Sequence, residues 1–287
     1  MDEADRLIRR ARPLLGTIVE IGVAPEYDTA IEAGFTEILR IHKLMSFHEN
    51  TSDLAKLRRA EAGETITVDR DTVAVLRIAA ELSDATGGLF NVAIGRQLVR
   101  TRFLPRMDAE HLGCFTGDAS DIEIIDDCSV RLRRRLLIDL GGIAKGYATD
   151  LAVAALQLAG VTSGIVNAGG DLRVFGDDPV PIHIRNAGNK RDECQSGYSA
   201  QFMIQNCAVA SSENVHDRRR INGQITTPHI GRNAHSVIAN HAVTVVADTC
   251  VIADAMTKVA MVDCKLADKI LAKYGGQVVR FETSKAA

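Results

Sequence analysis

The 287-residue sequence has no tryptophan, and only 4% of its residues are aromatic. Proteins that bind single-stranded nucleic acids stack bases on aromatic side chains, so this scarcity disfavours such a surface. The formal net charge of −3 also gives no excess of positive charge for a phosphate backbone. Arginine runs at 133–135 and 218–220 are short enough to be ordinary solvated surface. We therefore expect no nucleic-acid partner.

Long apolar runs are also missing, since none approaches the roughly 18 to 20 residues of a transmembrane helix. We expect no membrane span. The charged stretch 1–12 lacks the apolar segment of a secretory signal, so the expected location is the cytoplasm. A true start further upstream would instead allow a periplasmic location. We assign residues 1–12 to an N-terminal tail and 13–287 to one domain.

The six cysteines form no C-x-x-C pair, and no neighbouring histidine completes a zinc-binding pattern. This spacing argues against a disulfide scaffold and fits a reducing compartment.

Hydrophobic periodicity predicts both strands and helices across the chain. The predicted strands are 14–23, a hairpin over 121–132, 164–168, 181–185, 201–210, 242–247 and 277–281. Helices are predicted over 28–45, from an N-cap at Asp71 to about 85, over 144–159, and from about 250 and 265. Residues 96–120 show no clean period and are expected to be irregular and to lie at the surface. The fold class is α+β (mixed α/β), in a single two-lobed domain.

The central segment, residues 137–150, reads as a short strand, a glycine turn and a helix. Asp139 and Lys145 place opposite charges around Gly141 and Gly142, and the start of a helix offers amide donors to an anion. The segment matches neither the dinucleotide motif G-x-G-x-x-G nor the phosphate loop G-x-x-x-x-G-K-[ST]. A nicotinamide site is therefore disfavoured, whereas phosphate binding by another geometry stays open.

Two further groups could carry chemistry. Asp254 and Thr257 lie three residues apart on one helical face, and two hard oxygens there suit Mg²⁺. Spacing alone favours a simpler interpretation, in which Asp254 caps the helix or pairs with Lys258. His229 follows Thr-Thr-Pro in a polar loop, where it is either a general base or an ordinary histidine.

The order of these segments resembles the ApbE-type FAD:protein FMN transferase family. Three segments carry the central resemblance: the twelve residues at 139–150, Val-Asn-Ala-Gly-Gly-Asp-Leu at 166–172, and Ala-Asp-Ala followed by threonine at 253–257. Three N-terminal segments fall in the same order: Leu-Gly-Thr at 15–17, Leu-Met-Ser at 44–46 and Thr-Gly-Gly-Leu-Phe at 86–90. The resemblance spans about residues 12–282.

The resemblance implies a T-fold-like domain and a Mg²⁺-dependent transferase. Such an enzyme moves FMN from FAD to a Thr or Ser hydroxyl of an acceptor flavoprotein and releases AMP. It also implies three sets of residues. The FAD-binding set is Leu15, His48, Leu89, Phe90, Asn91, Asp139, Lys145, Gly169, Gly170 and Asp171. The metal set is Gly142, through its carbonyl, with Asp254 and Thr257; the catalytic set is His229, as general base, and Asp254.

The sequence departs from the family pattern at several positions. His48 stands where the family often has tyrosine, and Asn91 stands where it usually has aspartate. The loop after His229 lacks the usual Asp-Pro and Thr-Gly, and the Asp254-to-Thr257 spacing is one residue shorter than the commonest form. Two alternatives therefore stay open: a non-catalytic FAD carrier for assembly of a redox complex, and an FAD pyrophosphatase giving FMN and AMP. A homodimer is compatible with the sequence, which does not fix the oligomeric state.

Overall fold

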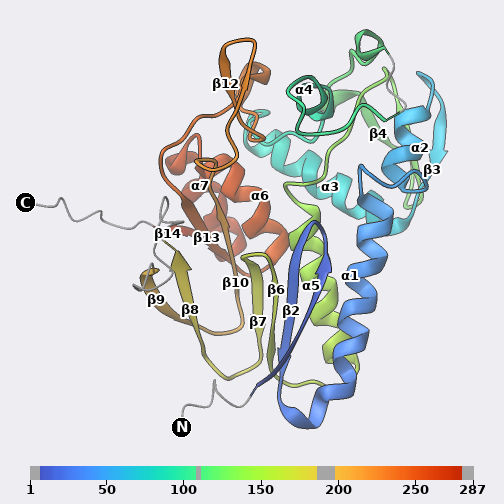
Figure 1. Cartoon of the computed structure of the whole chain (residues 1–287). Helices are drawn as coiled ribbons and strands as arrows, with labels where there is room; N and C mark the ends of the chain where they lie inside the picture. The colour runs from blue at the N-terminus through green and yellow to red at the C-terminus, as the bar shows by residue number, and fades with distance from the viewer. Residues whose placement is uncertain (1–6, 108–110, 186–197, 280–287) are drawn as a thin grey trace, which may run out of the picture.

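The computed structural model describes residues 7–107, 111–185 and 198–279. Within these ranges, a seven-stranded sheet runs in the order β1-β2-β6-β7-β10-β13-β14, and each neighbouring pair is antiparallel (Figure 1). Its strands are β1 (Ile8–Leu14), β2 (Thr17–Val23), β6 (Gly164–Ala168), β7 (Asp171–Phe175), β10 (Ala208–Ser212), β13 (Val243–Ala247) and β14 (Gln277–Val279).

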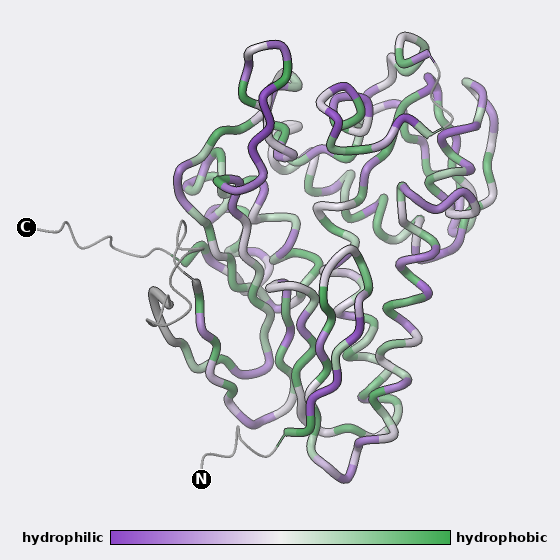
Figure 2. Tube along the Cα trace, in the orientation of Figure 1, coloured by the Kyte–Doolittle hydropathy of each residue, from purple (hydrophilic) through white to green (hydrophobic). Residues whose placement is uncertain are grey.

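Four helices cover one face of this sheet: α1 (Ile31–Met45), α5 (Ala144–Leu158), α6 (Cys250–Ala260) and α7 (Cys264–Leu271). In α1, the buried residues Ile31, Phe35 and Ile38 recur at steps of four and three, which places them on one helical face. Hydrophobic and hydrophilic residues accordingly alternate along this helix (Figure 2). The main core thus lies between the sheet and these helices.

The opposite face of the sheet is covered by the hairpin of β8 (Val180–Arg185) and β9 (Tyr198–Ile204). Neighbouring residues on a strand point to opposite faces, so Ile165 packs toward this hairpin whereas Val166 packs into the main core.

A second lobe lies beside the sheet (Figure 1). It contains α2 (Asp53–Arg59), α3 (Arg70–Ala85), α4 (Gly95–Arg100) and a three-stranded sheet of β3 (Thr65–Thr67), β5 (Ser129–Leu132) and β4 (Ile122–Ile124). The mixed fold class predicted from the sequence is therefore confirmed.

Two predicted strands are in fact pairs of strands. Residues 14–23 contain the tight turn Leu15–Gly16 between β1 and β2, and both turn residues have positive φ, 54° and 71°. Residues 8–12, predicted to be part of an N-terminal tail, therefore belong to β1. Residues 201–210 are interrupted at Asn206, whose φ of 47° ends β9 before β10 begins.

Three local predictions also need correction. The N-cap of α3 is Asp69, whose side chain accepts from the Asp71 amide, because α3 begins two residues earlier than predicted. Residues 137–140 do not form the predicted strand. They lie beside the turn before α4 and share two backbone hydrogen bonds with it, from the Asp139 amide to the Val92 carbonyl and from the Gly95 amide to the Leu137 carbonyl. The segment predicted as irregular contains the short helix α4. Residues 280–281 of the last predicted strand lie outside the described part.

Candidate functional site

A cavity of about 520 Å³ lies between the two lobes, within the size range of small-molecule sites. One wall is mostly apolar and comes from residues before and within the α4 region: Leu89, Phe90, Asn91, Val92, Ile94, Leu98, Phe103 and Leu104. The facing wall carries most of the polar groups: Asp139, Gly141, Gly142, Lys145, Ser211, Ser212, Glu213, His229 and Lys258. The cavity can therefore hold a ligand with an apolar body and a charged end.

Helices α5 and α6 cap each other beside this cavity. The Gly146 amide in the first turn of α5 donates to Asp254 Oδ2 of α6 at 3.1 Å. In return, the Cys250 and Val251 amides at the start of α6 donate to the Asp150 carboxylate of α5, at 2.9 and 2.8 Å. Carboxylates at these positions satisfy helix amides that would otherwise lack partners. This reciprocal capping fixes the relative position of the two helices.

Gly146 makes the close approach possible. A Cβ atom at this position would lie 2.2 Å from the Cys250 carbonyl oxygen, which no side chain could accommodate. Asp254 reaches α5 because the two backbones touch here. The glycine therefore serves packing rather than the glycine turn itself.

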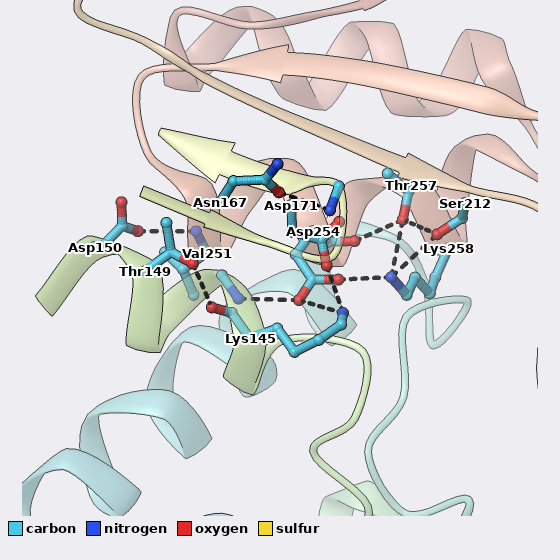
Figure 3. A network of polar contacts seen from close by, with 12 residues as sticks. Lys145, Thr149, Asp150, Asn167, Asp171, Ser212, Val251, Asp254, Thr257 and Lys258 are labelled. Atoms are coloured by element: carbon cyan, nitrogen blue, oxygen red, sulfur yellow. Dashed lines mark hydrogen bonds and ion pairs between the residues drawn. The ribbon is translucent and has the colours of Figure 1, made fainter. Parts of the chain in front are cut away.

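A buried charge network connects three elements (Figure 3). Lys145 Nζ lies 2.5 Å from Asp171 Oδ2, at the start of β7, and 3.4 Å from Asp254 Oδ2. Burial disfavours the charge on Asp254, yet Lys145, Lys258 and the Gly146 amide hold its pKa below the ordinary value. The pKa of Asp171 is raised by burial and by the charge of Asp254. The network thus places an ionised Asp254 between two ammonium groups.

The residues expected to hold magnesium surround the Lys258 ammonium instead. Its Nζ donates to Asp254 Oδ1 at 2.6 Å, Thr257 Oγ1 at 3.0 Å and Ser212 Oγ at 3.2 Å. A Cβ added at Gly142 would lie 3.2 Å from Lys258 Cε. In the described part of the chain, no three His, Cys, Asp or Glu side chains are arranged to hold a metal ion. The present donor set therefore does not fit a divalent cation while Lys258 is in place.

His229 lines the cavity near both lysines. Burial, assisted by the charges of Lys258 and Lys145, lowers the pKa of His229 to about 4. Among the described residues, its buried Nδ1 has no hydrogen-bond partner. The backbone carbonyl of His229 is held by the Val237 amide at 2.8 Å and by the Thr227 hydroxyl at 3.2 Å. A neutral imidazole thus lines the ligand space, with its Nδ1 buried and unpaired.

Asp139 lies at the start of the glycine turn. Burial raises its pKa to about 6, against the opposing hydrogen bond from the Gly141 amide. This carboxyl group is therefore close to its protonation midpoint under mildly acidic conditions.

Several predicted residues lie outside the cavity wall. The turn at Leu15 leads into Thr17, whose Oγ1 would lie 2.2 Å from a Cβ added at Gly169. Gly169 and Gly170 together form the turn between β6 and β7. His48 is exposed, and its charge acts on Asp139. Leu89, Phe90 and Asn91 do line the cavity, and Asn91 Oδ1 accepts from the Ala93 amide at 2.7 Å.

Sequence reasoning missed part of the wall. Leu98, Phe103 and Leu104 come from the segment predicted as irregular, and their spacing carries no signal for a ligand. No sequence motif points to Ser211 and Ser212 at the end of β10, which also line the cavity. The sequence predicts Lys258 only as a partner of Asp254, and its position four residues further along the helix is the signal for that contact.

Comparison with known proteins identifies a matching family, a related sequence and two similar solved structures. The model of the ApbE family matches residues 15–278. A protein named FAD:protein FMN transferase from Treponema pallidum is 28% identical over 185 residues, 58% of this chain, and the match spans about half (51%) of that relative's length. The crystal structure of the ApbE protein from Thermotoga maritima has a TM-score of 0.78 at 25% identity, covering 97% of this chain and 98% of that one. The apo flavinyl transferase ApbE from Pseudomonas stutzeri has a TM-score of 0.77 at 18% identity, covering 94% and 90%.

Proposed function

The chain belongs to the ApbE family, and on this premise we propose that it transfers FMN from FAD to a Thr or Ser hydroxyl of an acceptor flavoprotein. The observation that carries the proposal is one cavity that combines two ammonium groups, from Lys145 and Lys258, with the neutral imidazole of His229. Phosphoryl transfer needs cationic groups beside the phosphate oxygens and a base for the attacking hydroxyl. Both are present.

In the proposed reaction, the acceptor oxygen attacks the phosphorus of the FMN half of FAD. The bond from this phosphorus to the bridging oxygen breaks, and AMP leaves with the bridging oxygen. His229 takes the hydroxyl proton on its imidazole ring. Lys145 and Lys258 stabilise the negative charge on the phosphate oxygens, and the apolar wall with Phe90 receives the flavin ring.

Magnesium dependence, which the family resemblance implies, has no place in this scheme. The three residues expected to hold the ion, Gly142, Asp254 and Thr257, are arranged around Lys258. No step is therefore assigned to a metal. A homodimer and a cytoplasmic location stay predictions from the sequence.

The function is tested by incubating the protein with FAD and a candidate acceptor domain. Transfer yields flavin that stays with the acceptor after denaturation, together with released AMP. AMP without labelled acceptor would identify an FAD pyrophosphatase. Tight FAD binding with neither product would contradict the enzyme and leave the carrier alternative.

We expect His229→Ala to lower the transfer rate by about 100-fold, a typical contribution of a general base, while FAD affinity changes little. The rate of transfer and the dissociation constant for FAD are measured on the same preparation. His235→Ala is the matched control, because this histidine is exposed and follows in the same loop. An equal loss of binding and transfer in His229→Ala would make the residue structural.

A further inference from the structure

Lys258 stands where a cation is expected. Two of the residues assigned to the metal, Asp254 and Thr257, hydrogen-bond to its ammonium, at 2.6 and 3.0 Å. The third, Gly142, lies against its side chain, and Ser212 adds a further oxygen at 3.2 Å. Figure 3 shows these oxygens converging on one nitrogen. A single ammonium group therefore uses the two side-chain oxygens that the metal would need.

The shortened spacing explains why a lysine is there. Residues four apart on a helix are neighbours, and the residue four positions after Asp254 is Lys258. The hydroxyl of Thr257, one position earlier, instead donates to the Asp254 carbonyl at 2.7 Å and lies 2.7 Å from Ser212 Oγ. The departure from the commonest spacing thus replaces a metal-facing hydroxyl with a charged amine.

The charges of the network are already balanced. Asp171 and Asp254 supply two carboxylates, and Lys145 and Lys258 supply two ammonium groups in contact with them. Divalent cations favour sites with an excess of anionic oxygens, and a cation bound to Asp254 would sit beside the Lys258 ammonium. A second positive ion is disfavoured at this position.

We propose that Lys258 permanently supplies the positive charge of this site, so that the protein binds its dinucleotide without a divalent cation. The identity of the dinucleotide as FAD rests on the proposed function. The lack of a cation site is independent of the proposed function, because it is a property of the protein without its ligand.

Cation binding is tested first, without FAD, by electron paramagnetic resonance of Mn²⁺. We expect no saturable binding to the wild type up to about 1 mM, the weak limit of protein cation sites. Lys258→Thr, which places a hydroxyl four residues after Asp254, should gain one site that the double variant with Asp254→Ala loses. Saturable wild-type binding that Asp254→Ala abolishes would overturn the proposal. The wild-type titration decides even if Lys258→Thr does not fold.

FAD binding is then compared in EDTA and in Mg²⁺. We expect the wild-type dissociation constant to differ by less than about twofold between the two, and Lys258→Met to bind at least about tenfold more weakly in both. Lys258→Thr should recover affinity only in Mg²⁺. Lys265→Met, at an exposed lysine of α7, is the matched control and should match the wild type.

The two proposals fail in different ways. FAD bound equally well in EDTA but not used for transfer would sink the transferase and support the inference. FAD binding or transfer that requires Mg²⁺ in the wild type would sink the inference and leave the transferase. If FAD does not bind at all, the Mn²⁺ titration still decides.

Discussion

Asp139 illustrates how a single residue of the site affects stability. Its pKa is raised by burial to about 6, although the Gly141 amide stabilises the charged form. Between the ordinary pKa of aspartate and about pH 6, the native protein therefore binds more protons than the unfolded chain does. By linkage, the contribution of Asp139 to stability is present at low pH and is lost as pH rises through about 6.

We expect Asp139→Asn to increase the free energy of unfolding by about 1–2 kcal/mol near pH 8, because the amide stays neutral in the buried position. The gain should vanish near pH 4, where the wild-type carboxyl group is itself largely protonated. Urea unfolding across this pH range measures the difference. Asp177→Asn, the same substitution at an exposed aspartate, is the control. A variant less stable than the wild type at pH 8 would contradict the assignment.

The sequence predicts which residues line the site better than it predicts what each of them does there. Lys145, Asp139 and His229 were selected from the sequence, and all three line the cavity. The relation between Lys258 and Asp254 was open, because two side chains on one helix face support either an ion pair or a cation site. The position of Ser212, which comes from another element, shows that the oxygens converge on the lysine.

At the scale of elements, the helices follow closely from the sequence. The predicted end of α5 is confirmed, because Gly160 has φ 89° and the Gly160 and Val161 amides bond to Gln157 and Leu156 in a Schellman arrangement. Strand boundaries were less predictable. The break at Asn206 depends on one residue in a left-handed conformation, and β-propensity on both sides conceals it.

The contact of α5 with α6 gives a prediction for Gly146. Alanine normally stabilises a helix interior relative to glycine by about 1 kcal/mol. Here the added methyl group would meet the Cys250 carbonyl oxygen at 2.2 Å and push the helices apart. We expect Gly146→Ala to lower the free energy of unfolding by about 2–3 kcal/mol, as measured by urea denaturation.

Gly34→Ala in α1 is the matched control for that experiment. Its added methyl group would meet the flexible end of Ile21 at 2.7 Å, so a side-chain shift can relieve the contact. The loss of stability should therefore be smaller than for Gly146→Ala. Equal effects of the two substitutions would argue against a backbone clash.

For the whole molecule, the cavity depends on how the two lobes meet. The hairpin of β11 (Arg219–Ile221) and β12 (Gln224–Thr226), largely hydrophilic in Figure 2, lies across this boundary. The Arg219 guanidinium lies over the Phe103 ring at 4.4 Å and donates to the Arg102 carbonyl. Because Phe103 lines the cavity, this contact connects the hairpin to the ligand wall.

We expect Arg219→Ala to weaken FAD binding by about three- to tenfold, the range of one cation–π contact, and to change the free energy of unfolding by less than about 1 kcal/mol. Flavin fluorescence and urea unfolding provide the two measurements. Arg220→Ala is the control, since this exposed side chain donates a hydrogen bond within the hairpin, to the Gly223 carbonyl. Unchanged affinity in Arg219→Ala would remove the hairpin from the binding site.

The lobe arrangement itself could not be derived from periodicity. Local patterns predict each helix and strand, but the meeting of Phe103 with Arg219 joins residues more than a hundred positions apart. No described helix is long and apolar enough to cross a membrane.

The reciprocal capping of α5 and α6 also bears on how the chain folds. Asp150 and Asp254 each complete the first turn of the other helix, across a separation of about a hundred residues. Such distant contacts carry a large loop-closure cost and tend to form after local structure. The chain between these two helix starts includes β6 to β13. We therefore expect the ligand-binding end of the molecule to be completed late in folding.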